Sequence, residues 1–154
     1  MANNAEELFE IGLKYHDGTG VPQDSEKALQ YYRQSAEQGY DQAQYVMGLY
    51  YEGDLSDITN KNADFQKSAE WYKKAAEQNY APAQFHLAFL YRNGKGVPQD
   101  DEKSEKLLLQ SAENGHAYAQ LILGLHYKSK AIEWLKKSAE NGDEEALAEL
   151  EKIK

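Results

Sequence analysis

Apolar side chains along this chain recur at three- and four-residue intervals, which is the spacing of a helix with one buried face. Gly, Asn and Asp residues interrupt this pattern at short distances and predict where helices end and begin. Scarce valine and abundant Ala, Leu, Glu, Gln and Lys also favour helices over strands. The predicted helices lie near residues 5–16, 25–38, 41–52, 65–78, 81–92, 101–114, 117–128 and 131–141.

Two sequence blocks recur along the chain. In the first block, a large apolar residue is followed by Gly or Ala and, three positions later, by Tyr. Its copies begin at Ile11, Met47, Leu87 and Leu123, at steps of 36, 40 and 36 residues. The second block is an aromatic or Leu pair followed by a pair of small residues. Its copies begin at Tyr31, Trp71, Leu107 and Trp134.

These blocks predict one all-α domain over residues 1–154, an α/α superhelix (solenoid) of about four antiparallel helix pairs. The expected units span residues 5–40, 41–80, 81–116 and 117–143, and a capping helix follows at 144–154. The small residue of the first block should let the partner helix approach closely, because a larger side chain would hold the two backbones apart.

A seven-residue stretch links the helices of two units. Residues 18–24 and 94–100 agree at six of seven positions, at a distance of 76 residues. Each copy combines glycines suited to positive φ, an extended step before proline, and a final Asp that can cap the next helix. Asp64 is the corresponding cap in the second unit, where the longer loop over residues 53–63 lacks the Gly-Val-Pro step and is expected to be mobile.

The repeated residues resemble the Sel-one-like repeat, a relative of the tetratricopeptide repeat. The run from Ala81 through Asp100 and Lys103, and the run from Ala117 through Tyr127, match its first half, and Glu70 through Ala76 match its second half. The first unit departs from the pattern, because Glu7 and Leu8 replace the expected Ala and Gln. The resemblance implies a superhelix of helix pairs that binds proteins, and it implies no catalytic chemistry.

The fourth unit lacks a loop. Gly12 and Tyr31 are 19 positions apart, whereas Gly124 and Trp134 are only 10 apart, so nine residues are missing. Either residues 128–130 form a very tight turn, or the two helices fuse into one. A stripe at four-residue spacing is compatible with fusion; it consists of Leu123, Tyr127, Ala131, Leu135 and Ala139. A fused helix around Tyr127–Ala131 would seek a groove on another chain and form a domain-swapped dimer.

Charge and composition narrow the function classes. The chain has 17 basic and 26 acidic residues, a net charge of −9, which disfavours binding to nucleic acid or an anionic membrane and is compatible with a basic partner. No apolar run approaches the roughly 18–20 residues that span a bilayer. We expect a soluble protein, cytoplasmic as written, or periplasmic or secreted if a leader has been removed.

The sequence indicates no catalytic, metal or cofactor site. There is no cysteine, and none of the four histidines forms a two-His helical pair or a cluster with carboxylates. The acidic runs 100–102 and 144–145 lie at helix starts, where capping and the helix dipole favour acids. The Gly-x-Gly loops lack the features of a phosphate-binding loop.

The remaining candidate is a surface. By analogy with tetratricopeptide-like repeats, certain positions on the first helix of each unit should face a concave groove that binds a protein or peptide, although packing between adjacent repeats is an alternative for the aromatic ones. The candidate groove residues are Phe9, His16, Tyr45, Leu49, Glu52, Phe85, Phe89, Arg92, Tyr118, Leu121 and His126.

The preferred interpretation is a non-catalytic protein-interaction module, an adaptor or scaffold. One alternative is a small acidic immunity or inhibitor protein that neutralises a basic toxin or enzyme, because an acidic surface speeds capture of a basic partner. A more remote alternative is a hydrolase built on a helical scaffold.

Overall fold

The computed structural model describes residues 4–53 and 63–153, and this part of the chain forms eight α-helices and no strand. The helices are α1 (Ala5–Asp17), α2 (Ser25–Glu37), α3 (Asp41–Glu52), α4 (Phe65–Glu77), α5 (Ala81–Asn93), α6 (Asp101–Glu113), α7 (Ala117–Glu140) and α8 (Glu144–Ile153). The predicted all-α fold is confirmed. The loop expected to be mobile lies almost wholly at residues 54–62, outside the described residues.

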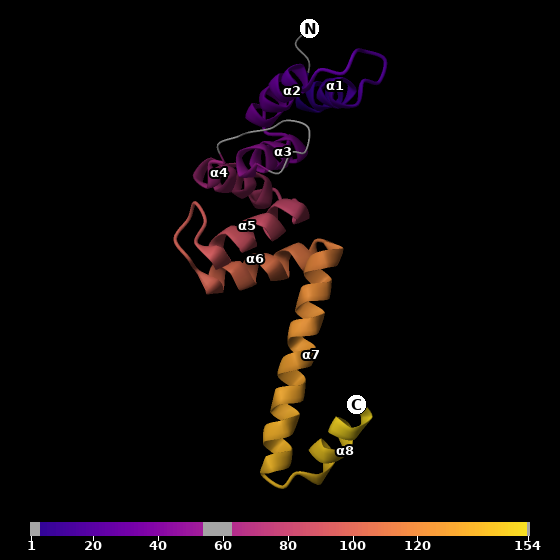
Figure 1. Ribbon diagram of the computed structural model, residues 1–154, viewed down its shortest axis with the longest axis vertical. Helices are drawn as coiled ribbons and strands as arrows, with labels where there is room; N and C mark the ends of the chain where they lie inside the picture. Colours follow the sequence, from indigo (N-terminus) through magenta and orange to yellow (C-terminus); the bar gives the residue numbers. More distant parts are fainter. Residues whose placement is uncertain (1–3, 54–62, 154) are drawn as a thin grey trace.

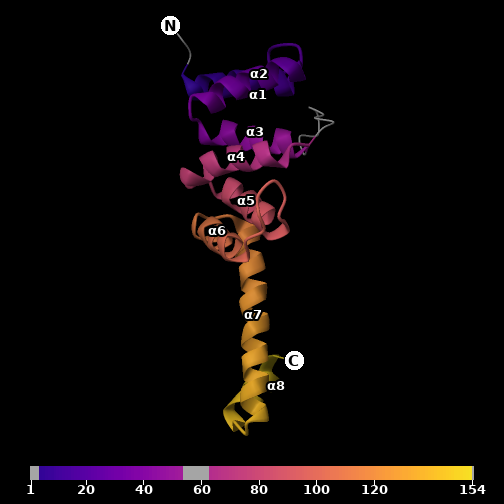
Figure 2. The same ribbon diagram turned by 90° about the vertical axis from the view of Figure 1, so that its left-hand side faces the viewer.

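The first six helices form three antiparallel pairs, α1 with α2, α3 with α4 and α5 with α6. Successive pairs stack through contacts of α2 with α3 and of α4 with α5, so the pairs follow one another in a row (Figures 1 and 2). We call these pairs the first, second and third units. Their stacking is the α/α superhelix that the repeated blocks predict.

The predicted Asp caps are confirmed. The backbone amides of Lys27, Lys67 and Lys103 donate hydrogen bonds of 3.0, 3.1 and 2.9 Å to the side chains of Asp24, Asp64 and Asp100. Each cap satisfies an amide that the first helical turn leaves without a partner. The backbone amide of each Asp also bonds to a Tyr carbonyl at the end of the preceding helix, which closes the loop; these tyrosines are Tyr15, Tyr51 and Tyr91.

The predicted seam between paired helices is also present. A Cβ added to Gly12 would lie only 2.7 Å from ring carbons of Tyr32, and Gly48 makes the same close contact with Tyr72. Tyr72 is fully buried. A glycine is therefore required at these positions by the ring that lies against the backbone.

The fourth unit differs from the first three. A single helix, α7, runs through residues 128–130 without a turn, so the structure has the fused helix and not the tight turn. The first half of α7 packs on α6, and the second half projects away from α1–α6 (Figures 1 and 2). Helix α8 folds back along this second half, where Ala146 is buried.

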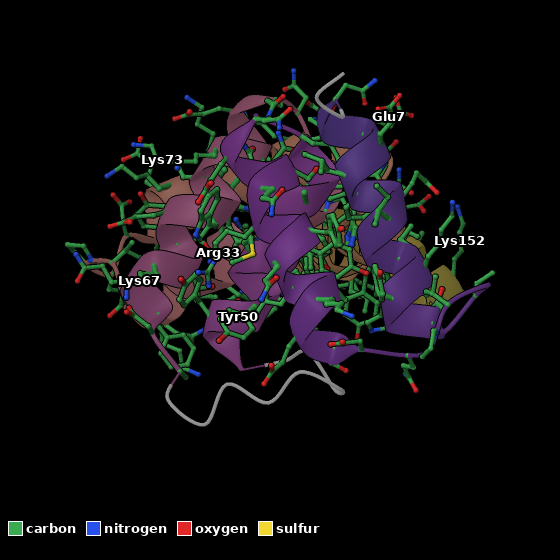
Figure 3. The ribbon with its side chains drawn as sticks, turned by 90° about the horizontal axis from the view of Figure 1, so that it is seen from above. Glu7, Arg33, Tyr50, Lys67, Lys73 and Lys152 are labelled. Carbon is green, nitrogen blue, oxygen red and sulfur yellow. The ribbon has the colours of Figure 1, made fainter. Side chains whose placement is uncertain are left out.

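The N-terminal end of the row exposes the first unit to solvent. Seen from this end, α1 and α2 lie in front of the other helices, and Glu7 stands at the edge, near the start of α1 (Figure 3). Glu7 forms a capping box with Asn4, the residue that precedes α1. The departure of Glu7 from the repeat pattern thus serves the start of the first helix.

Candidate functional site

The first set of candidate residues packs between adjacent units. The ring of Phe9 lies 5.2 Å from that of Tyr40, the ring of Tyr45 lies 5.4 Å from that of Tyr80, and the ring of Phe85 lies 4.5 Å from that of His116. In each case the partner is the residue that precedes the first helix of the next unit. These contacts between aromatic rings therefore hold neighbouring units together.

Phe9 must be removed from the candidate groove. Its side chain is only 6% exposed and belongs to the core shared by α1, α2 and α3, so no partner can reach it. The prediction failed because Tyr32 and Tyr40 close over the ring from both sides. Tyr45 and Phe85 are half-buried and keep one accessible edge.

Polar candidates of the second and third units meet in one network. The Tyr72 hydroxyl donates a hydrogen bond of 2.7 Å to Glu52 Oε2. His86 Nδ1 lies 3.3 Å from the same oxygen, and His86 Nε2 lies 3.3 Å from the Tyr45 hydroxyl. The network joins α3, α4 and α5 and leaves about a quarter of the Glu52 and His86 side chains exposed.

The network shifts the pKa values of its members. Burial by itself would raise the pKa of Glu52, but hydrogen bonds from His86 and Tyr72 outweigh burial and hold that pKa below its ordinary value. Burial and the nearby Glu52 carboxylate raise the pKa of Tyr72 far above the usual range. The pair is thus stable as a carboxylate that accepts a hydrogen bond from a neutral phenol.

A row of exposed apolar side chains continues from this network toward the C-terminal end. Phe85 contacts Phe89 at a ring distance of 5.0 Å and Tyr118 at 5.9 Å. Phe89 is 41% exposed and Tyr118 is 60% exposed, and Leu121 and Leu125 on the next helix are also exposed. We call these four residues, together with the half-buried Phe85 that contacts Phe89 and Tyr118, the exposed apolar row.

The other N-terminal candidates are less accessible. Leu49 is half-buried and packs against the core of α4 and α5. His16 is half-buried, with Nδ1 2.8 Å from Asp17 Oδ1 and its ring 6.4 Å from that of Tyr32. Both residues offer a partner an edge and no large surface.

Arg92 and His126 line a different cavity, a cleft between the end of α5, the first half of α6 and the middle of α7. The cleft has a volume of about 540 Å³, and Asp101 and Glu105 are among its lining residues. Arg92 and His126 therefore lie in one cleft with the carboxylates of Asp101 and Glu105. This cleft does not include Glu52 or His86.

Sequence reasoning missed three contributors to this surface, Tyr72, His86 and His116. Tyr72 belongs to the second repeated block and was not considered for the groove, and the two histidines were considered as metal ligands and not chosen for the groove. His116 occupies the position held by Tyr40 and Tyr80 in earlier units, and its ring packs on Phe85. The recurrence of an aromatic ring directly before each first helix was the signal that identifies it.

Within residues 4–53 and 63–153, no group of three or more His, Asp or Glu side chains is arranged to hold a metal ion. Among the described helices, none combines the length and the apolar character needed to cross a bilayer.

The Sel1 repeat family pattern matches residues 8–40, 41–80, 81–116 and 128–143. A Sel1 repeat protein from Oxalobacter formigenes is similar over 78% of this chain and 87% of its own, with 28% identity and a TM-score of 0.71. Helicobacter pylori cysteine rich protein B has the same fold at 21% identity, over 77% of this chain and 88% of its own, with a TM-score of 0.61.

A third similar structure is c5321, a protective antigen of uropathogenic Escherichia coli strains that displays an SLR fold. It is 30% identical over 95% of this chain, which spans 40% of that protein, and the TM-score is 0.43. All three similar proteins are bacterial.

Proposed function

The chain belongs to the Sel1 repeat family, whose members generally act as scaffolds for protein–protein interaction, and we propose that it binds a polypeptide along the exposed apolar row. The observation that carries this proposal is the adjacency of Phe89 and Tyr118, which are both exposed and both contact Phe85. Neighbouring exposed aromatic side chains are typical of protein interaction sites, whereas single exposed apolar residues are ordinary on any surface.

The ring of Phe85, next to these side chains, is packed against other rings, which favours affinity. Phe85 lies between the rings of His86 and His116, at 5.8 and 4.5 Å, so its orientation is set before a partner arrives. A preorganised aromatic side chain loses little conformational entropy on binding. Phe89 and Tyr118 are therefore the proposed anchors, and Leu121 and Leu125 would extend the contact.

Polar groups beside the row are proposed to select the partner. Glu52 remains ionised down to lower pH than an ordinary glutamate and keeps part of its side chain accessible. With a net charge of −9, the chain as a whole favours a basic segment. We therefore expect a polypeptide with apolar anchors and flanking Lys or Arg residues.

The proposal is tested by selecting peptides that bind the full chain from an unbiased displayed library. The best binders are then measured by fluorescence anisotropy against the double variant Phe89→Ala/Tyr118→Ala. Loss of two anchors should weaken binding at least about tenfold, because each truncated hot spot commonly costs more than about 1 kcal/mol. Unchanged affinity of all selected peptides for the folded double variant would reject the surface.

Ile153→Ala is a matched control, because Ile153 is 42% exposed, close to the 41% of Phe89, and lies on α8. This variant should bind the selected peptides like the parent. An equal loss of affinity in both variants would show that the measurement reports nonspecific apolar contact.

The acidic charge also supports the second candidate, an inhibitor that captures a basic toxin or enzyme. Electrostatic capture would make the association rate fall steeply with salt. Binding through the apolar row would instead leave the association rate nearly constant and respond mainly to the anchor substitutions.

A further inference from the structure

In α7, no ring of the described residues covers the glycine of the close-packing position. Gly124 is the counterpart of Gly12 and Gly48, which are covered by the rings of Tyr32 and Tyr72. A Cβ added at Gly124 would meet no other atom within 4 Å. The first half of α7 therefore presents an uncovered packing surface at Gly124, and none of the helices in the described part of the chain occupies it.

The segment that should cover this surface lies further along the same helix, in the second half of α7. Residues 130–140 carry the second block, in which Leu135 corresponds to Tyr32 and Tyr72. Trp134 is 68% exposed. Ala131 is exposed as well, although its counterparts Ala28 and Ser68 are completely buried.

We propose that a second copy of this chain supplies the missing helix, so that two chains form a reciprocal dimer through α7. Residues 130–140 of each chain pack antiparallel on residues 117–128 of the other, with Leu135 of one copy over Gly124 of its partner. Because Gly124 and Leu135 lie on either side of Ser129 and Lys130, a two-fold axis through this midpoint satisfies both contacts at once.

A serine contact found in the first and third units is compatible with the same pairing. Ser35 Oγ donates a hydrogen bond of 2.5 Å to the carbonyl of Ala5, and Ser111 Oγ donates one of 2.7 Å to the carbonyl of Ala81. The corresponding residues of the fourth unit are Ala117 and Ser138, and the Ser138 hydroxyl donates a hydrogen bond of 2.8 Å to Asp143 Oδ2 of its own chain. In the dimer this hydroxyl would exchange Asp143 for the Ala117 carbonyl of the partner. Ala117 and Ser138 lie at opposite ends of one helix, about 30 Å apart at 1.5 Å per residue, so only another chain can bring them together.

The occupant is a second copy because the required sequence is already in the chain. The family pattern matches residues 128–143 as a repeat segment, although residues 128–140 continue α7 as one helix and so cannot fold back on its first half. In each copy the first half of α7 packs on α6 but lacks a paired second helix, and the second half packs on α8 but lacks a paired first helix. Two copies can supply these missing partners to each other, and the assembly then closes. An unrelated partner would leave residues 130–140 exposed.

The dimer also completes the inter-unit contacts. Phe9, Tyr45 and Phe85 are each covered by the residue that precedes the next first helix. The next residue of this kind after Leu121 is Asp143, at the start of α8. In the dimer the partner's α8 reaches Leu121, and the row of first helices continues across the two-fold axis. Leu121 then no longer belongs to the exposed apolar row, and Phe89 and Tyr118 remain as the proposed anchors for a polypeptide.

Cysteine pairs test the geometry cleanly, because the chain has no cysteine of its own. In the double variant Gly124→Cys/Leu135→Cys, the two positions are 11 residues apart on one helix, about 16 Å, beyond the roughly 7 Å limit for a disulfide. Under mild oxidation, we expect a disulfide between chains, seen as a reducible dimer on a gel. A disulfide within one chain, or none, would overturn the proposal.

Ala88→Cys/Leu108→Cys is the matched control, because these are the equivalent positions of the third unit and lie in helices that pair within one chain. This variant should form a disulfide within the chain and no dimer. It shows that the oxidation conditions capture helix pairs of this kind.

Restoring the loop that the fourth unit lacks should prevent dimerisation. We insert a copy of residues 93–101 between Lys128 and Ser129, which gives the fourth unit the spacing of the third. Light scattering should give twice the chain mass of 17.5 kDa for the parent and the single chain mass for the insertion variant. A monomeric parent from micromolar to millimolar concentration, or a dimer that survives the insertion, would overturn the proposal.

Discussion

The second and fourth units contain the same two sequence blocks, but only the second unit closes on itself. From Gly48 to Tyr72 there are 24 positions, enough for a turn, and the Tyr72 ring lies on Gly48. From Gly124 to Leu135 there are only 11, and the backbone stays helical throughout. Loop length therefore decides whether complementary helices meet within one chain, even when their side chains match.

The largest expected difference between the two units follows from truncating the packing residue of the second block. Tyr72→Ala should lower the free energy of unfolding by about 3–5 kcal/mol, because a fully buried ring is replaced by a cavity. Leu135→Ala, measured in dilute solution where the chains are monomeric, should cost less than about 1 kcal/mol. Urea unfolding followed by circular dichroism measures both.

Equal losses for the two truncations would contradict the comparison. That result would mean that α7 folds back on itself in solution, or that Leu135 is buried by another contact at every concentration.

A methyl group added at the glycine of the seam should act with opposite sign in the two units. Gly48→Ala should destabilise by about 1–3 kcal/mol, because the added Cβ overlaps the Tyr72 ring. Gly124→Ala should stabilise by about 0.5–1 kcal/mol, because an open helix position favours Ala over Gly. Thermal and urea unfolding of the two single variants check this sign change.

The Gly124→Ala variant should also keep the dimer. The third unit already has Ala88 opposite Leu108 at the equivalent positions, so a methyl group fits below a leucine. Destabilisation by both alanine substitutions would show that Gly124 is covered as tightly as Gly48.

Removal of the Asp cap that follows a loop should destabilise the unit that carries it. Asp100→Ala should cost about 1 kcal/mol, because the hydrogen bond to the Lys103 amide is lost. Asp101→Ala, one residue later and exposed, should cost less, since it removes only a charge near the helix start. Chemical denaturation measures the difference, which vanishes if the cap contributes nothing.

The smallest expected effect is a pH dependence of the second unit. Because the pKa of Glu52 is lower in the folded chain than its ordinary 4.5, its stabilising contribution is present above pH 4.5 and is lost as the pH falls through the folded value. Unfolding free energies measured from neutral to acid pH should therefore fall less steeply in Glu52→Gln than in the parent.

Glu133→Gln on α7 is the counterpart in the fourth unit. Hydrogen bonding to Lys137 lowers the pKa of Glu133 too, but this carboxylate is exposed and water screens the pair. At acid pH, the unfolding free energy of this variant should fall as it does in the parent. If the unfolding free energy fell less steeply with decreasing pH in both variants, the Glu52 network would not be the cause.

The candidate surface could be predicted only in part. Of the residues predicted to line the groove, Phe89, Tyr118 and Leu121 are exposed, and Tyr45 and Glu52 share the His86 network. Their role in binding a partner stays a prediction. The prediction failed for Phe9, because burial depends on which rings of the neighbouring helices close over a position. A helical period shows which residues share a face, and it does not show how deeply each lies.

Helix caps, turns and close packing contacts within one unit could be predicted from the amino-acid sequence. Asp100 caps its helix, Asn79 adopts a positive φ of 64°, and Gly48 lies under an aromatic ring, and each role depends on residues in one unit. The state of residues 128–130 was not readable in this way, because a turn and a continuous helix both satisfy the local pattern. The tertiary structure selected the continuous helix: three residues cannot reverse the chain and also seat Leu135 on Gly124, so the backbone keeps its helical hydrogen bonds and leaves Gly124 uncovered.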